Sequence, residues 1–251
     1  MTQPHPAFSR PQRIALDGRY CRLEPLSMSH AADLYAATSG EGEDDRYRWL
    51  FSAPPVDQVA LSAQIAADAT LDDPLHFAVV DLATGRAGGR QALMRIVPEH
   101  GVIEIGAVQW GRGIAKTRLA TEALYLFARY AFETLGNRRF EWKCNALNAP
   151  SRRAAARFGF TYEGIFRQHM IIKGENRDTA WFSILDGEWP RLKAGYEAWL
   201  LPENFDADGN QIKKLSFGCA STLACERASG HPPVRASRVS QCRDASGLGY
   251  E

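Results

Sequence analysis

The feature that most constrains this sequence is a β-rich run that leads through two glycines into an amphipathic helix, within residues 102–117. Residues 102–109 are rich in Val and Ile and predict a partly buried strand. Gly111 and Gly113 predict a tight loop whose backbone can approach a ligand closely. On the helix that follows, apolar residues recur every three or four positions, at Leu119, Ala123, Phe127 and Tyr130.

The start of that helix predicts an anion site, because its free N–H groups and the positive end of its dipole both point at the glycine loop. The nucleoside-triphosphate loop GxxxxGK[ST] does not fit, since Trp110 and Ala115 stand where its glycines belong when Lys116-Thr117 form its end. The dinucleotide fingerprint GxGxxG fails too, with Lys116 or Thr117 near its third glycine. An ordinary tight turn before a helix remains an alternative.

Composition limits the possible partners. The 251 residues carry a formal net charge of +1, so we expect neither nucleic acid nor membrane as a partner. Residues 1–13 contain prolines but no apolar run, which predicts a flexible N-terminal segment rather than a signal peptide or an anchor. No later stretch approaches the roughly 18 apolar residues of a membrane helix.

The cysteines and the C-terminal composition give two further expectations. Five cysteines without a CxxC pair predict reduced thiols and a cytoplasmic protein. Residues 204–251 are dominated by Ser, Gly, Arg and Pro without periodicity, and we predict a disordered tail there. We expect no metal site, because no common zinc spacing relates Cys219, Cys225, His231 and Cys242.

The order of predicted elements indicates an α/β chain with a mixed sheet. Three strands joined by short turns (75–82, 91–97 and 102–109) predict an antiparallel meander that ends at the glycine loop. The helix after the loop and a strand at 138–144 predict a right-handed parallel crossover. A final hairpin around residues 174–176 and a helix at 189–200 complete the predicted domain.

Two motifs together resemble the GNAT superfamily of N-acetyltransferases. Residues 110–115, Trp-Gly-Arg-Gly-Ile-Ala, resemble the [Q/R]-x-x-G-x-[G/A] loop that holds the coenzyme A pyrophosphate, with Trp110 in place of Gln or Arg. Residues 148–164 resemble the N-x-x-[S/A]…G-F…E-G pattern of the same family. The subgroup of ribosomal-protein N-terminal (Rim-type) acetyltransferases, which also holds small-molecule amine acetylases, is the most similar, and residues 177–179, Arg-Asp-Thr, fit it.

The resemblance implies a fold, a domain and a coenzyme site. The implied fold is a GNAT-like mixed, mostly antiparallel sheet of about seven strands, splayed at the acetyl-CoA site and flanked by helices, within residues 14–203. Acetyl-CoA is the implied co-substrate. The implied coenzyme-binding residues are Ala107, Val108, Gln109, Gly111, Arg112, Gly113, Ile114, Ala115, Lys116, Thr117, Asn148 and Ser151.

The catalytic candidates follow from what amine acetylation requires. Many GNAT enzymes protonate the departing thiolate with a tyrosine where this chain has Ala155, so the resemblance implies Ser151 as the acid, with a helix-cap or first-turn hydroxyl as its alternative. Glu104 is the first candidate base and His169 the second, because an imidazole titrates near neutral pH. Glu104 could instead be a solvated strand carboxylate, and His169 a structural residue.

These readings predict an acetyl-CoA-dependent N-acetyltransferase that acts on a primary amine, in a monomer or homodimer. A non-catalytic acyl-CoA-binding module on the same fold is the alternative, and a nucleotide-binding protein is a third interpretation. The lack of an evident strong base favours an α-amine acceptor, on a protein N-terminus or a small molecule. At pH 7.4 an α-amine of pKa about 7.7 is neutral roughly a third of the time, whereas a lysine amine is neutral roughly 0.1% of the time.

Overall fold

The computed structural model describes residues 8–39 and 47–218. The first residues of the predicted flexible segment, 1–7, lie outside the described residues, as does most of the predicted C-terminal tail, 219–251, with its three cysteines and its histidine. Within the described ranges, no helix is both long enough and apolar enough to cross a membrane.

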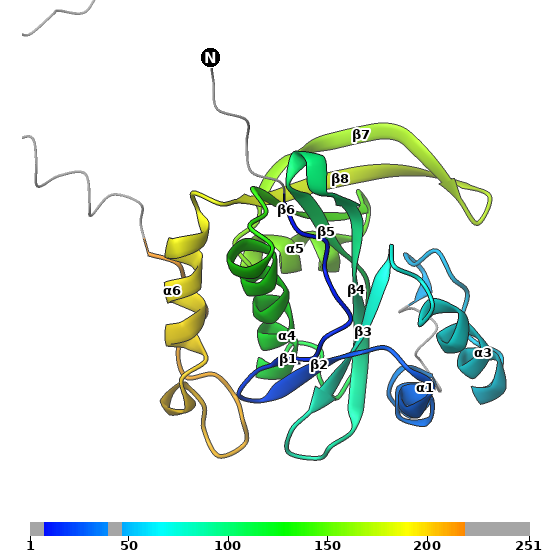
Figure 1. Cartoon of the computed structure of the whole chain (residues 1–251), viewed down its shortest axis with the longest axis horizontal. Helices are drawn as coiled ribbons and strands as arrows, with labels where there is room; N and C mark the ends of the chain where they lie inside the picture. Colours follow the sequence, from blue (N-terminus) through cyan, green and yellow to red (C-terminus); the bar gives the residue numbers. More distant parts are fainter. Residues whose placement is uncertain (1–7, 40–46, 219–251) are drawn as a thin grey trace, which may run out of the picture. The chain divides into compact units, whose positions relative to one another are not determined.

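One mixed sheet organises the described chain (Figure 1). Its eight strands lie in the order β1-β2-β3-β4-β5-β6-β8-β7, and β5 and β6 form the parallel pair in an otherwise antiparallel sheet. The predicted mixed, mostly antiparallel sheet and its parallel crossover are confirmed. The strands are β1 Leu16–Asp17, β2 Cys21–Pro25, β3 Leu75–Asp81, β4 Ala87–Val97, β5 Val102–Trp110, β6 Arg139–Asn145, β7 Thr161–Ile172 and β8 Glu175–Leu185.

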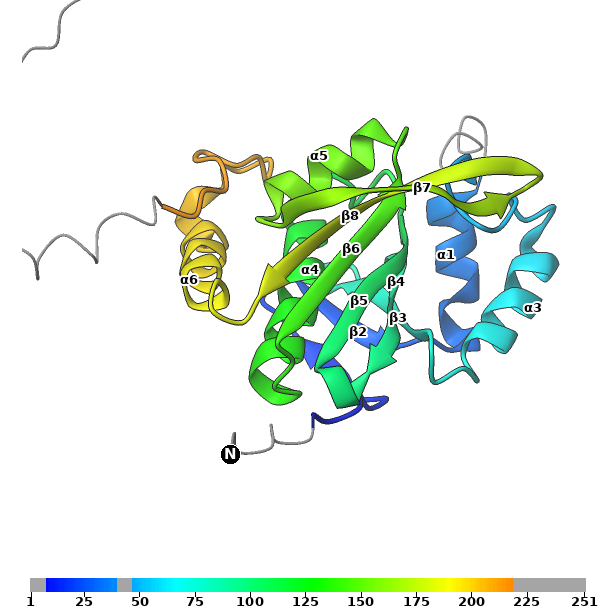
Figure 2. The same ribbon diagram turned by 90° about the horizontal axis from the view of Figure 1, so that it is seen from above.

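Helices cover both faces of the sheet (Figure 2). Helices α1 (Ala31–Thr38) and α3 (Gln58–Asp68) lie on one face, while α4 (Arg118–Arg129), α5 (Ala149–Arg157) and α6 (Trp189–Trp199) lie on the other. A π-helical turn, η3 (Tyr130–Thr134), continues α4. The short helices are η1 Met28–His30, η2 Pro98–His100 and η4 Pro202–Asn204.

Alternation along β3 shows why both faces are covered. Phe77 and Val79 belong to the larger apolar cluster, on the side of α4, where the Phe77 and Phe127 ring centroids are 5.3 Å apart. Ala78 and Val80 point the other way and join a second cluster with residues of α1 and α3. Because β3 is buried on both faces, its sequence is apolar apart from His76 and the terminal Asp81.

The sheet opens between β5 and β6. Their parallel pairing runs only from Val102 opposite Arg139 to Ile105 opposite Trp142. Beyond this point β5 continues beside β4, and β6 continues beside β8. Strand β5 bulges where it parts from β6. The bulge is marked by a register shift between β4 and β5 and by a positive φ of 49° at Ala107.

Described residues on both sides of the predicted domain, 14–203, make contacts with it. Within the segment predicted to be flexible, the N–H of Ser9 donates to the Leu135 carbonyl at 3.3 Å, and Arg13 pairs with Asp72 at 2.9 Å. Beyond residue 203, Leu215 and Phe217 pack against the larger core cluster. The compact unit extends to Gly218. The apolar side chains of this polar stretch pack against the core, as Phe217 does against Tyr196 of α6.

Candidate active site

A cleft of about 1010 Å³ opens where β5 and β6 part. The glycine loop and the start of α4 contribute Ala115, Lys116 and Thr121 to its walls, and α5 contributes Ser151. The strand residues Glu104 to Val108 lie along its floor together with Lys143 to Asn145. The splay of the sheet thus places loop, helix and strand residues around one cavity.

Gly111 and Gly113 have different surroundings in the loop. A Cβ on Gly111 would lie 2.4 Å from the Ala37 carbonyl oxygen and 2.8 Å from that of Gly88, so this position must be glycine for the loop to pack. A Cβ on Gly113 would meet no atom within 4 Å. Ile114 is buried in the core and anchors the loop. Gly113 therefore leaves open space at the loop surface, which a ligand can use.

Helix α4 begins at a side-chain cap beside the cleft. The Thr117 hydroxyl accepts from the Leu119 N–H at 3.2 Å and donates to the Ile114 carbonyl at 2.7 Å. Its hydroxyl is thus occupied within the chain, whereas Ala120 and Thr121 of the first turn line the cleft. The positive end of the helix dipole lies at the cavity, which suits an anionic ligand.

Helix α5 presents a hydroxyl from the opposite wall. Asn148 caps the helix, its Oδ1 accepting from the Ser151 N–H at 3.1 Å. The Ser151 Oγ accepts from the Trp142 Nε1–H at 2.9 Å. Burial raises the pKa of the Cys144 thiol, and the neighbouring Ser151 hydroxyl opposes that rise, so the Ser151 hydroxyl lies beside both Trp142 and Cys144. Ser151 is a first-turn residue and not the cap. Ala155 is fully buried and presents no polar group.

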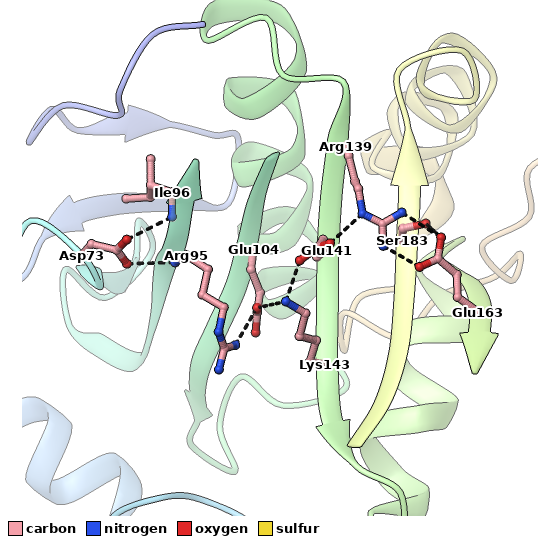
Figure 3. Close-up of polar contacts among 9 residues, drawn as sticks. All are labelled: Asp73, Arg95, Ile96, Glu104, Arg139, Glu141, Lys143, Glu163 and Ser183. Carbon is pink, nitrogen blue, oxygen red and sulfur yellow. Dashed lines mark hydrogen bonds and ion pairs between the residues drawn. The ribbon is translucent and has the colours of Figure 1, made fainter. Parts of the chain in front are cut away.

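Glu104 is buried and ion-paired, not solvated (Figure 3). Its side chain is 3% exposed. The Arg95 guanidinium lies 2.7 Å from Glu104 Oε2, and the Lys143 ammonium lies 2.9 Å from the same oxygen. Oε1 lies on the side of Gly106, 3.6 Å from where a Cβ of that glycine would stand. One carboxylate oxygen is thus held by two cations at the floor of the cleft.

The pairing continues across the sheet as a chain of alternating charges (Figure 3). Lys143 also contacts Glu141 Oε2 at 2.6 Å, and Arg139 contacts Glu141 Oε1 at 2.6 Å. Arg139 in turn pairs with Glu163, and this ion pair holds the pKa of the Glu163 carboxyl below its usual value. At the other end, Asp73 accepts from the backbone N–H groups of Arg95 and Ile96 at 2.8 and 3.0 Å. The chain of charges fixes the Glu104 carboxylate in position.

His169, the second candidate base, is not among the residues that line the cleft. It is exposed on β7, its Nδ1 lies 3.0 Å from the Thr179 Oγ1, and its ring lies against Phe166 and Trp181. Gln109 is also held elsewhere, since its Oε1 accepts from Arg90 Nε at 2.6 Å. The predicted residues that line the cleft are Glu104, Ala107, Val108, Ala115, Lys116, Asn148 and Ser151; those that do not are Gln109, Gly111, Arg112, Gly113, Ile114, Thr117 and His169.

Two cleft residues, Lys143 and Arg95, had no role in the sequence analysis, and both contact Glu104. Trp49, Phe51 and Arg177 also line the cavity. The alternation Arg139, Glu141, Lys143 along β6 is a signal for a charged strand face that the sequence carries.

Comparisons with known proteins agree on one family. The model of the acetyltransferase (GNAT) domain matches residues 21–161. This chain belongs to the GNAT family. A crystal structure of a GCN5-related N-acetyltransferase from Brucella melitensis is 54% identical, with a TM-score of 0.81, and the match covers 83% of this chain and 95% of that one.

Two further relatives extend the GNAT assignment. A GNAT-family structure from Chromobacterium violaceum is 37% identical with a TM-score of 0.70, covering 76% of this chain and 95% of that one. The uncharacterized N-acetyltransferase p20 of Bacillus licheniformis is 27% identical over 163 residues, 63% of this chain and 89% of p20. GNAT acetyltransferases use acetyl-CoA, and the open loop surface, helix start and cations of this cleft fit such an anionic co-substrate.

Proposed function

We propose that this GNAT protein is an acetyl-CoA-dependent N-acetyltransferase that moves the acetyl group to a primary amine by direct attack in a ternary complex. The observation that carries the proposal is the position of Glu104 and Ser151, which line one cleft together with the glycine loop and the start of α4. A proton acceptor and a hydroxyl donor therefore share a cavity with an anion site.

The coenzyme binds along the loop and the two helix starts. Backbone groups of residues 111–117 contact its phosphates, with Lys116 as the local cation, and Asn148 contacts the pantetheine arm. The backbone N–H groups of Ala107, Val108 and Gln109 serve the developing oxyanion. This role is supported by the end of β5–β6 pairing at Ile105, because the edge of β5 that faces the cleft continues without β6 beside it.

The chemical step forms a C–N bond and breaks a C–S bond. The amine nitrogen attacks the thioester carbonyl, its proton passes to Glu104, and the departing thiolate takes a proton from Ser151. Positioning in one cleft can supply an effective molarity of about 10⁵ M or more, and a general acid or base typically adds about 10²–10⁴-fold. His169 has no direct part in this scheme, because it lies outside the cleft.

The acceptor in this proposal is an α-amine, either of a protein N-terminus, as in the Rim-type subgroup, or of a small molecule. Glu104 Oε2 is already occupied by two cations, and an amine that is partly neutral at physiological pH needs less help from a base. Efficient acetylation of peptide lysines with free α-amines ignored would contradict this preference.

The test is an assay of thiol release. Purified protein is incubated with acetyl-CoA and a panel of amines, namely N-terminal peptides, amino acids, polyamines and aminoacyl nucleotides, while coenzyme binding is measured by calorimetry. We expect thiol release that depends on one class of α-amines. Coenzyme binding without turnover on any amine would contradict the enzymatic proposal, and no coenzyme binding would contradict the assignment of the loop.

A further inference from the structure

Arg177 stands out because a buried nitrogen of its side chain has no hydrogen-bond partner among the described residues. The residue is 7% exposed, and its Nε is buried and has no hydrogen-bond partner in the described chain. Its guanidinium lies over the Phe51 ring, 5.0 Å from the centroid. Among residues 8–39 and 47–218, the side chains with such an unpartnered buried atom are those of Ser39, Tyr47, His76, Arg177 and Trp181. Of these, Arg177 alone lines the cleft or the smaller cavity beside it. An unpaired buried cation is costly, so a ligand that pairs with it gains binding energy.

Arg177 lies at the end of the cleft away from the glycine loop. It lines both the main cleft and a smaller cavity of about 350 Å³ beside the tip of the β7–β8 hairpin. That smaller cavity shares Arg48, Trp49 and Asn145 with the main cleft but no residue of the loop. The Lys173 ammonium donates to the Tyr47 carbonyl at 2.8 Å and joins the hairpin tip to the segment before Arg48. This end of the cleft is therefore the place for an acceptor, not for the coenzyme phosphates.

The charges at this end favour an anion. The main cleft is lined here by Arg48, Arg95, Lys143 and Arg177, and its sole acidic lining residue in the described chain is Glu104. Glu104 is already paired with Arg95 and Lys143. Neither Arg48 nor Arg177 forms an ion pair within the described ranges. The smaller cavity adds one cation, Lys173, and one carboxylate, Glu175, so the described lining of this end carries more cations than carboxylates.

We propose that Arg177 binds an anionic oxygen group, a carboxylate or a phosphate, carried by the amine acceptor. The planar guanidinium fork matches two oxygens of such a group. The inference rests on the proposed acyl transfer and adds the class of acceptor: an amine that also bears an anion.

The strand register places this anion site and Glu104 on one face of the sheet. Lys143 of β6 pairs with Trp181 of β8, and its ammonium lies 3.8 Å from the centre of the Trp181 ring. Arg177 lies four residues before Trp181 on the same strand, so alternation puts both on the face of Lys143. An acceptor held at Arg177 can thus direct its amine towards Glu104.

The test compares matched α-amines that differ in one anion. L-Aspartic acid α-amide is paired with L-asparagine amide for the carboxylate, and O-phospho-L-serine amide with L-serine amide for the phosphate. The ratio of kcat/KM within each pair is measured by thiol release in the wild type, in Arg177→Gln and in Arg167→Gln. Arg167 is a matched control, since it is exposed on β7 and lines neither cavity.

We expect the wild type to favour one anionic amine, and Arg177→Gln to reduce that preference by about tenfold or more, the usual range for a charged hydrogen bond. Arg167→Gln keeps the preference. The pair of amines in which the wild type shows this preference identifies whether Arg177 binds a carboxylate or a phosphate. Equal ratios in the wild type and Arg177→Gln would overturn the inference while leaving acyl transfer intact.

A failure of the proposed function is separable from a failure of this inference. If no amine releases thiol, the acyl-transfer proposal fails. Calorimetry of the same four amines on the protein loaded with coenzyme A then decides the anion site. Tighter binding of an anionic amine by the wild type than by Arg177→Gln supports it, and equal binding overturns it.

Discussion

At the residue scale, the two ion pairs of Glu104 decide how it can act. Both cations bind Oε2, so the geometry holds the carboxylate still while Oε1 points along the Gly106 side. A general base needs a fixed position first and a suitable proton affinity second. The pairing supplies the first of these requirements.

Glu104→Gln removes the proposed base while keeping the side chain's shape. We expect kcat to fall by about 10²-fold or more, the lower end of general-base effects, while the dissociation constant of coenzyme A changes little. Steady-state thiol release and calorimetry measure the two quantities.

The matched control for Glu104→Gln is Glu141→Gln. Glu141 belongs to the same chain of charges, since it pairs with Lys143 and Arg139, but it does not line the cleft. A structural role for the charges would give both variants a similar loss of kcat and of unfolding temperature, and that result would contradict a base at Glu104. A larger loss of kcat in Glu104→Gln alone supports the proposal.

Ser151→Ala removes the proposed proton donor to the thiolate. We expect kcat to fall by about tenfold or more, because the loss leaves the sulfur to depart without protonation by a side chain. Ser151→Thr keeps a hydroxyl beside Trp142 and should recover part of the rate. A Ser151→Ala enzyme with wild-type kcat would show that this hydroxyl only accepts from the Trp142 indole.

At the element scale, we expect substitutions of the two loop glycines to have different effects, one on stability and the other on coenzyme binding. In Gly111→Ala, the new methyl group would stand 2.4 Å from a backbone oxygen of α1, and we expect a loss of about 1–3 kcal/mol in the free energy of unfolding. In Gly113→Ala the methyl group meets no protein atom, so stability should hold while the coenzyme binds more weakly. Thermal unfolding and calorimetry test both variants. Equal coenzyme affinity in Gly113→Ala and the wild type would contradict close approach of the coenzyme at this glycine.

The helices and strands also show which features of the fold the sequence could predict. Period-two and period-3.6 patterns predicted the meander, the long helix and the parallel crossover, because these depend on local alternation and short connections. The pattern could not place Lys143 and Arg95 beside Glu104, because those contacts depend on the register between strands. His169 shows the same limit: a register shift in β7 between Phe166 and Met170 sets its place on the hairpin, and no local pattern predicts that shift.

At the scale of the whole molecule, the described chain continues past the last helix to close the core. Phe217 lies against Tyr196 with ring centroids 5.2 Å apart, and Arg191 donates to its carbonyl at 2.9 Å. Two glycines make room for its ring, since a Cβ on Gly195 would lie 2.7 Å from a ring atom and one on Gly159 would lie 2.9 Å from another. Composition predicted no structure here because a few scattered apolar residues in a polar stretch carry no periodic signal.

Phe217→Ala should therefore destabilise the compact unit. The ring is half-buried, so we expect about 1–3 kcal/mol off the free energy of unfolding, less than the about 3–5 kcal/mol of a fully buried phenylalanine. Ile212→Ala is the matched control, because Ile212 is 65% exposed in the same segment. Chemical denaturation measures both variants alongside the wild type. If Phe217→Ala and Ile212→Ala lose the same small amount, residues 205–218 add little to the core and the domain is better bounded near residue 203.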